Sequence, residues 1–351
     1  MVFARTCVRI VGCNDRHNNM IMRKHIAPAL IALMLCLPLT LQAKVEHLLP
    51  RPQQVTVTEN AAAFALSGNV TINYADGAVQ CALLEEFFTS NGCTLAEGGK
   101  SVNVSLVESI EGAHDYELHG YENEAYTLEI TANGINITAV TATGVIRAAQ
   151  TLTQLAEGYD EGQAAIETVE ITDWPAFKLR GYMHDVGRSF ISIDELVKQV
   201  EKFSRFKVNT FHWHLTENQA WRFEVKAYPE LTSLESMTRF PGQYYTQDDC
   251  KRLMAVAKKH GVIVIPEIDM PGHSEAFERA MGFGMQTEEG KAVLKKVIDE
   301  AVEVFADAPY IHIGGDEVTT TAAYLNEMIA YAESKGANVK GGLWNPINGI
   351  G

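Results

Sequence analysis

From residue 178 onward the chain alternates short apolar segments with longer amphipathic ones, and this alternation restricts its fold more than any other feature. The apolar segments have the length and composition of buried strands and lie at 179–185, 210–215, 262–268, 310–313 and 339–343. The segments with helical periodicity lie at 193–206, 247–260, 288–306 and 321–335. Strand–helix alternation predicts an α/β fold with a parallel sheet covered by helices. In α/β barrels the functional residues follow the carboxyl ends of the strands.

The preceding part of the chain, residues 44–172, has a different pattern and is expected to form a small, non-catalytic α+β domain. Its alternating, strand-like segments are 54–58, 69–73, 102–106, 126–130 and 135–139. Asn133-Gly134, between the last two, is a strong hairpin-turn signal. Helical spacing appears at 79–88 and 144–155. Asp173-Trp174-Pro175 marks the boundary, so residues 173–351 form the second domain.

Residues 1–43 are expected to be a leader with a signal peptide. Arg23 and Lys24 precede an apolar run at 26–41, and the small residue Ala43 ends the segment. The run is short for a bilayer span and contains two prolines, although an N-terminal membrane anchor is the alternative. We therefore expect an exported protein, periplasmic or secreted, with no stable membrane span in the mature chain.

Charge and cysteine usage exclude several classes of protein. The chain carries 29 basic and 44 acidic residues, a net charge of −15, which argues against a nucleic-acid binder. Beyond the leader it retains Cys81, Cys93 and Cys250, an odd number without a CxxC motif. This pattern argues against a disulfide scaffold or a zinc knuckle. Cys81 and Cys93 are either a disulfide pair or small buried side chains.

Clusters of ionisable residues follow the first two predicted strands of the second domain. After the first come Asp185 and Arg188, either an ion pair that closes a turn or a site in which the guanidinium binds hydroxyls or a carboxylate. His212 and His214 lie two apart on the second strand, hence on the same side of it, and Glu217 follows. Such a histidine pair either ligates a metal or is hydrogen-bonded inside a polar barrel mouth.

The next two predicted strands end in similar clusters. Glu267 and Asp269 are two residues apart and precede His273, whose tautomer a carboxylate can fix. Two glycines precede Asp316 and Glu317 and leave room for a ligand near the backbone. Because neighbouring strand residues point to opposite sides, these two are a poor facing acid–nucleophile pair of the ordinary retaining type.

The motifs RGYMHDVGR, HWHLTENQAWR, PEIDMPGH and HIGGDEV, taken together, resemble those of glycoside hydrolase family 20, the β-N-acetylhexosaminidases. The resemblance implies a TIM-type (β/α)8 barrel preceded by a small α+β domain, with no cofactor and no metal. It implies exo-acting hydrolysis of terminal non-reducing N-acetylglucosamine or N-acetylgalactosamine from oligosaccharides or glycoconjugates. The implied mechanism is retaining and substrate-assisted: the 2-acetamido carbonyl of the sugar attacks the anomeric carbon.

The resemblance also implies roles for individual residues. By matching position, Glu317 is the general acid/base, and Asp316 orients the acetamido group. Arg188 and Glu217 bind hydroxyls of the terminal sugar, and Trp344 lines the acetamido pocket. The remaining implied residues support the site: His273, oriented by Asp269 or Glu267, together with His214 and Asp185.

Two departures from the family pattern change these expectations. Glu217-Asn218 stands where the family has Asp-Asp, so the sugar preference is expected to shift. The second domain offers five strand candidates, whereas a closed barrel needs eight strands and typically about 250 residues. We therefore expect an incomplete barrel of the first four to five units. The alternatives are a truncated, inactive carbohydrate-binding remnant, and a metal-dependent hydrolase that uses His212 and His214.

Overall fold

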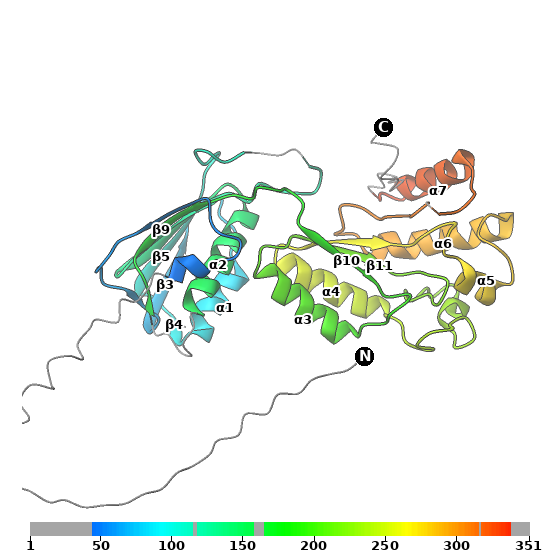
Figure 1. Ribbon diagram of the computed structural model, residues 1–351, viewed down its shortest axis with the longest axis horizontal. Helices are drawn as coiled ribbons and strands as arrows, with labels where there is room; N and C mark the ends of the chain where they lie inside the picture. The colour runs from blue at the N-terminus through cyan, green and yellow to red at the C-terminus, as the bar shows by residue number, and fades with distance from the viewer. Residues whose placement is uncertain (1–43, 115–117, 158–164, 316, 338–351) are drawn as a thin grey trace, which may run out of the picture. The chain divides into compact units, whose positions relative to one another are not determined.

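The computed structural model describes residues 44–114, 118–157, 165–315 and 317–337. The first part of this region is a seven-stranded sheet with the order β1-β9-β6-β7-β5-β3-β4 (Figure 1). Its strands are β1 (Gln54–Val57), β3 (Gly68–Tyr74), β4 (Cys93–Leu95), β5 (Lys100–Leu106), β6 (Tyr126–Thr131), β7 (Gly134–Ala139) and β9 (Val169–Asp173). A separate short pair joins β2 (Phe64–Ala65) to β8 (Ala165–Ile166).

The five strands expected in this domain are present, and the hairpin at Asn133-Gly134 joins β6 to β7 in antiparallel pairing. The helices α1 (Ala82–Ser90) and α2 (Ala142–Ala156) pack together, and α2 packs on β6 and β7. Cys81 and Cys93 are free and buried in this core, so they are small apolar side chains rather than a disulfide.

The second part holds a parallel three-stranded sheet, β10-β11-β12, made of β10 (Gly181–Asp185), β11 (Thr210–His214) and β12 (Ile263–Glu267). Its helices are α3 (Ile193–Ser204), α4 (Gln247–Lys259), α5 (Glu275–Met281), α6 (Glu288–Val304) and α7 (Ala322–Ser334). Two 3-10 turns lie at Lys44–His47 and Pro229–Thr232. The helices α3 and α4 pack side by side (Figure 1). The predicted α/β alternation is therefore confirmed.

The segment expected as a fourth strand, 310–313, forms a single parallel bridge from His312 to Glu267 rather than a strand. Its backbone nevertheless runs along β12, because His312 donates to the carbonyl of Pro266 and accepts from the amide of Ile268. Gly314 and Gly315 then turn the chain at φ values of +63° and +107°, which ends the pairing. The fifth candidate, 339–343, lies outside the described residues, and an incomplete barrel stays a prediction.

Hydroxyl side chains begin most of these helices. A serine or threonine just before the helix accepts a hydrogen bond from an amide of the first turn and satisfies a donor that the helix leaves open. These capping residues are Thr141, Ser192, Thr246, Thr287 and Thr321. At α4, Asp249 also accepts from the amide of Thr246, which completes a capping box. These caps define where each of the five helices begins.

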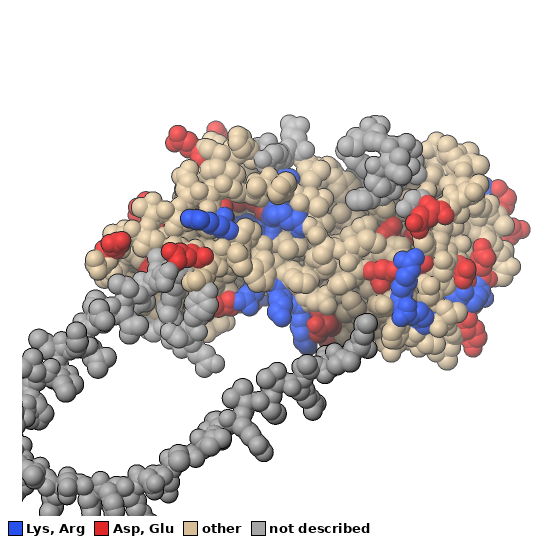
Figure 2. All heavy atoms as spheres, in the orientation of Figure 1, with Lys and Arg blue, Asp and Glu red and all other residues tan. Residues whose placement is uncertain are grey.

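Each sheet has an apolar core of its own. Around the first sheet it includes Phe64, Phe88 and Ile130. Around the second sheet it includes Phe211 and Trp213. Among the described residues no helix is both long and apolar enough to cross a bilayer. On the face shown in Figure 2, acidic and basic side chains are interspersed rather than gathered into one basic surface.

A buried ionic cluster links residues of the two parts. Glu124 is 5% exposed and accepts hydrogen bonds from Arg147 at 3.0 Å and from Asn209 at 2.8 Å. Arg180, just before β10, pairs with the same carboxylate. Burial raises the pKa of Glu124, but the two guanidinium groups outweigh it and hold the pKa below its usual value.

The substitution Glu124→Gln is expected to lower the free energy of unfolding by about 3–5 kcal/mol, because it leaves Arg147 buried without its counter-charge. Chemical denaturation monitored by circular dichroism measures this change. The control is Lys258→Gln, which removes the exposed ion pair with Asp307 and is expected to cost less than about 1 kcal/mol. Equal losses in the two variants would contradict the prediction.

Candidate active site

The predicted site residues that the structure describes gather at the carboxyl ends of β10, β11 and β12. Asp185 and His214 are the last residues of β10 and β11, and Glu267 is the last residue of β12. Parallel pairing places His214 beside both Asp185 and Glu267. The ionisable side chains therefore converge because the strands that carry them end at one edge of the sheet.

Arg188 connects the first two of these strand ends. Its Nη1 donates to Oδ2 of Asp185 at 2.7 Å, and its backbone amide donates to Oδ1 of the same side chain at 2.9 Å. Its Nη2 donates to Oε1 of Glu217 at 3.0 Å. The ion pair with Asp185 that closes the turn is present, and the Arg188 side chain remains 47% exposed. The guanidinium is therefore held in place and still accessible to a ligand. Binding of sugar hydroxyls by this guanidinium stays a prediction.

Glu217 is buried, in contrast to the hydroxyl-binding position expected for it. It is 1% exposed, and its Oε1 accepts from both Arg188 and His273. It fits because residue 187 is glycine: a Cβ there would lie 2.3 Å from the Cβ of Glu217. Burial raises the pKa of Glu217, but the neighbouring His214 and His273 outweigh it and lower the pKa. Its role in binding sugar hydroxyls stays a prediction.

His273 lies between two carboxylates. Its Nδ1 is 2.6 Å from Oε1 of Glu217, and its Nε2 is 3.1 Å from Oε2 of Glu317. Of the two carboxylates expected to orient this histidine, Asp269 makes a longer ion-pair contact, 3.9 Å from Nε2, and Glu267 contacts other histidines, so the short hydrogen bond on Nδ1 comes from Glu217 instead. The turn after β12 carries His273, with φ +47°, toward the end of β11, where Glu217 lies. Burial lowers the pKa of His273, but Glu217 raises it above its ordinary value.

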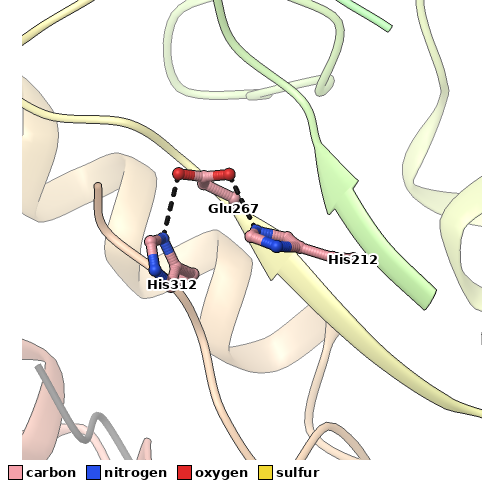
Figure 3. Close-up of side chains that lie close together, drawn as sticks. All are labelled: His212, Glu267 and His312. Atoms are coloured by element: carbon pink, nitrogen blue, oxygen red, sulfur yellow. Dashed lines mark hydrogen bonds and ion pairs between the residues drawn. The ribbon is translucent and has the colours of Figure 1, made fainter. Parts of the chain in front are cut away.

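Glu267 lies at the centre of three histidines. Oε2 is 2.8 Å from Nε2 of His212 and 2.7 Å from Nδ1 of His214, and Oε1 is 2.9 Å from Nδ1 of His312. Figure 3 shows His212 and His312 on either side of the carboxylate. Burial raises the pKa of Glu267, but the three imidazoles hold it well below its usual range. His212 and His214 thus lie on the same side of β11, as expected.

The same side chains are the ones that could hold a metal ion. Two groups bring their ligand atoms within 4.8 Å of one another: His212, Glu267 and His312, and His214, Glu267 and Asp269. In both groups a histidine nitrogen lies at hydrogen-bond distance from Glu267. A nitrogen that donates a proton to this carboxylate cannot ligate a metal, so a cation would have to replace those protons. Within the described residues this network is not closed, because Nε2 of His312 and Oε2 of Glu217 have no hydrogen-bond partner.

Asp269 is held by backbone groups beneath the exposed part of the site. Its amide donates to Oγ1 of Thr216 at 2.9 Å, and its Oδ1 accepts from the amide of Gly315 at 3.4 Å. A Cβ on Gly314 would lie 1.8 Å from Oδ1, so Asp269 fills the space that this glycine leaves. The expectation that this space is open to a ligand is therefore wrong for Gly314. Burial and the charge of Glu267 raise the pKa of Asp269 to about 6.

Glu317 is the most accessible carboxylate of the group. Its side chain is 72% exposed, and its backbone has φ +55°. Asp316 and Trp344, which were expected to contact the acetamido group, lie outside the described residues. His312 was not among the predicted site residues. Its place near the end of a predicted strand, like that of His214, could have indicated that it belongs to the site. Thr216, which holds the Asp269 backbone, carried no signal of its own.

Comparison with known proteins agrees with the motifs. Residues 177–291 match the model of the glycosyl hydrolase family 20 catalytic domain, and residues 46–174 match the model of domain 2 of that family. A β-hexosaminidase of Porphyromonas gingivalis is 36% identical over 229 residues, 56% of this chain and 29% of that protein. β-Hexosaminidase 1 of Coccidioides posadasii is 30% identical over 274 residues, 69% of this chain and 45% of that protein. The chain spans less than half the length of these relatives.

Solved structures give the same result. The β-N-acetylhexosaminidase of Bacteroides fragilis superposes with a TM-score of 0.68 at 26% identity, over 82% of this chain and 64% of that one. A family 20 exo-β-N-acetylglucosaminidase of Vibrio harveyi, in complex with N-acetylglucosamine, gives 0.69 at 26% identity, over 84% and 53%. These neighbours are TIM-barrel enzymes with a preceding domain. The two family models together match well over half of the chain, and the chain therefore belongs to glycoside hydrolase family 20.

Proposed function

We propose that this chain hydrolyses terminal, non-reducing N-acetylhexosamine residues of oligosaccharides or glycoconjugates. The observation that carries the proposal is the linked set Glu317, His273, Glu217 and Arg188 at one end of the parallel sheet. It joins an exposed carboxylate to a histidine, a buried carboxylate and an accessible guanidinium. A relative with the same fold binds N-acetylglucosamine, which supports this class of sugar.

The chemistry assigned to Glu317 is proton transfer. It would protonate the glycosidic oxygen as the bond breaks and then take a proton from the attacking water. Its exposure suits a group that must reach the bound sugar. His273 at 3.1 Å from Glu317 would fix the orientation of the carboxyl group and respond to its change of charge.

The nucleophile is proposed to be the acetamido oxygen of the substrate. The described carboxylates near Glu317 are Glu217 and Asp269, and both are buried and hydrogen-bonded to protein groups. Neither is available to form a covalent bond with the sugar, which supports substrate-assisted catalysis, a documented route in family 20. By resemblance, Asp316 would orient the acetamido N–H, and Trp344 would line its pocket.

Arg188 is proposed to bind hydroxyls of the terminal sugar. Asp185 and Glu217 hold two of its nitrogen atoms, so little side-chain entropy is lost when a sugar binds. The planar guanidinium can donate to adjacent hydroxyls at once.

The substitution Glu317→Gln is expected to lower kcat for a chromogenic β-N-acetylglucosaminide by about 100- to 10,000-fold, because the amide cannot supply a proton. The release of the chromophore by the 351-residue chain measures this rate. The matched control is Glu289→Gln, an exposed carboxylate of α6, which is expected to leave the rate unchanged. Undiminished turnover in Glu317→Gln would remove Glu317 from the mechanism, and sugar binding without turnover in the wild type would favour a carbohydrate-binding remnant.

A second prediction concerns the substrate. The corresponding β-glucoside, which carries a hydroxyl in place of the acetamido group, is expected to react at least about 1000-fold more slowly, since it lacks the internal nucleophile. Paired measurements of kcat/KM on the two substrates provide the comparison. Similar values would show that the acetamido group does not attack.

Export is also proposed. The predicted signal peptide lies within residues 1–43, outside the described residues. Cleavage after Ala43 would give a mature chain that begins at Lys44. Mass spectrometry of the protein recovered from its native cell envelope or medium is expected to show this amino terminus. An intact leader on the recovered protein would contradict the proposal and favour the membrane anchor.

A further inference from the structure

The hydrogen-bonded set that ends at Glu317 does not begin at Glu217. Behind Glu217 lies His214, whose Nε2 is 3.7 Å from Oε2 of Glu217 and whose Nδ1 is 2.7 Å from Oε2 of Glu267. Carboxylate and imidazole groups therefore alternate from Glu267 through His214, Glu217 and His273 to Glu317. At 3.7 Å the contact between His214 and Glu217 is an ion pair rather than a hydrogen bond.

The two oxygens of Glu217 have different surroundings. Oε1 accepts from both Arg188 and His273, at 3.0 and 2.6 Å. Oε2 is buried and has no hydrogen bond within the described part of the chain, and the charge that faces it is that of His214. A buried carboxylate oxygen that lacks a compensating charge is costly. The position of Glu217, and hence of His273, thus depends on His214.

His214 can interact favourably with both Glu217 and Glu267 because it is held as a cation. It is 5% exposed, between two buried carboxylates. Burial lowers its pKa, but Glu217 and Glu267 outweigh this effect and raise it to about 10. The charged groups closest to His214 are Glu217 and Glu267. Asp269, after β12, and Asp185, at the end of β10, also face it. The ring of His273 lies 6.1 Å from the ring of His214. An imidazolium has two donors, one for each adjacent carboxylate.

Glu267 is in turn fixed by the sheet. It is paired in register with His214 of β11 and bridges to His312 on its other side. His212 and His312 contact it from those two neighbouring segments, at 2.8 and 2.9 Å (Figure 3). Its carboxylate therefore cannot turn away from His214 without losing contacts on both flanks.

We propose that His214 and Glu267 are positioning residues for Glu317: Glu267 fixes His214, and His214 fixes Glu217 in the orientation that holds His273 against the acid. This inference rests on the proposed function of Glu317. It predicts that a substitution at His214, which Glu217, His273 and Glu317 separate from the substrate, changes the proton-transfer chemistry rather than sugar binding.

The test uses the variants His214→Gln and Glu267→Gln, with His184→Gln as the matched control. His184 is on β10 but bonds to Gln199 of α3, away from the site. In His214→Gln, kcat is expected to fall about 10- to 100-fold, because His273 loses its fixed position. KM is expected to change less than about 3-fold, because Asp185 still holds Arg188 through two hydrogen bonds that do not involve Glu217. In Glu267→Gln, kcat is expected to fall in the same way, with KM little changed, because the ring of His214 loses the carboxylate that lies 2.7 Å from its Nδ1.

A readout without turnover separates this inference from the proposed function. Nuclear magnetic resonance of isotope-labelled histidines follows the Nδ1–H of His273, which faces Glu217 at 2.6 Å. Its signal is expected to shift or exchange rapidly in His214→Gln and to remain in His184→Gln. Glu267→Gln is the second variant if His214→Gln does not fold. An unchanged His273 signal together with an unchanged kcat in both variants would overturn the inference. A lost signal in a chain that hydrolyses nothing would support it and count against the proposed function.

Discussion

The site depends on the carboxylate of Glu267 and the three histidines around it. Taking one carboxylate out of water is costly unless several donors replace the solvent. Here the donors come from β11 and from the segment that bridges to β12. The same contacts that satisfy the buried charge also align the three backbone segments that carry the outer residues. The contacts that compensate the charge of Glu267 are therefore the same ones that align β11, β12 and the segment around His312.

This arrangement explains why the outer residues can remain partly exposed and still be well placed. The side chains of Arg188 and Glu317 are 47% and 72% exposed, yet each contacts a less exposed partner, the buried Glu217 or the partly buried His273. Flexible surface groups usually lose entropy when they bind a ligand. Here the contacts with Glu217 and His273 already restrict the two side chains, so less side-chain entropy is lost when a ligand binds. This suits a site that must accept and release a polar sugar.

Much of this could be predicted from the sequence because the signals are local. Most strands of the two sheets, the hairpin at Asn133-Gly134 and the clusters at the strand ends follow from periodicity and turn chemistry. The strands at 93–95 and 169–173 were missed, since one is short and the other pairs with distant segments. The pairing of His273 with Glu217 was also missed. It depends on how the turn after β12 is directed and on the room that Gly187 leaves, and neither is encoded in spacing along the chain.

Gly314 shows how far the demands of this site extend. It has no side chain that could take part in the reaction, yet a methyl group there would overlap the carboxylate of Asp269, and its φ of +63° disfavours residues that carry a side chain. Two independent constraints, one steric and one conformational, therefore act against substitution at this position. Gly314 should therefore vary as little among related proteins as Glu317 does. An invariant residue at this site can thus be structural rather than catalytic.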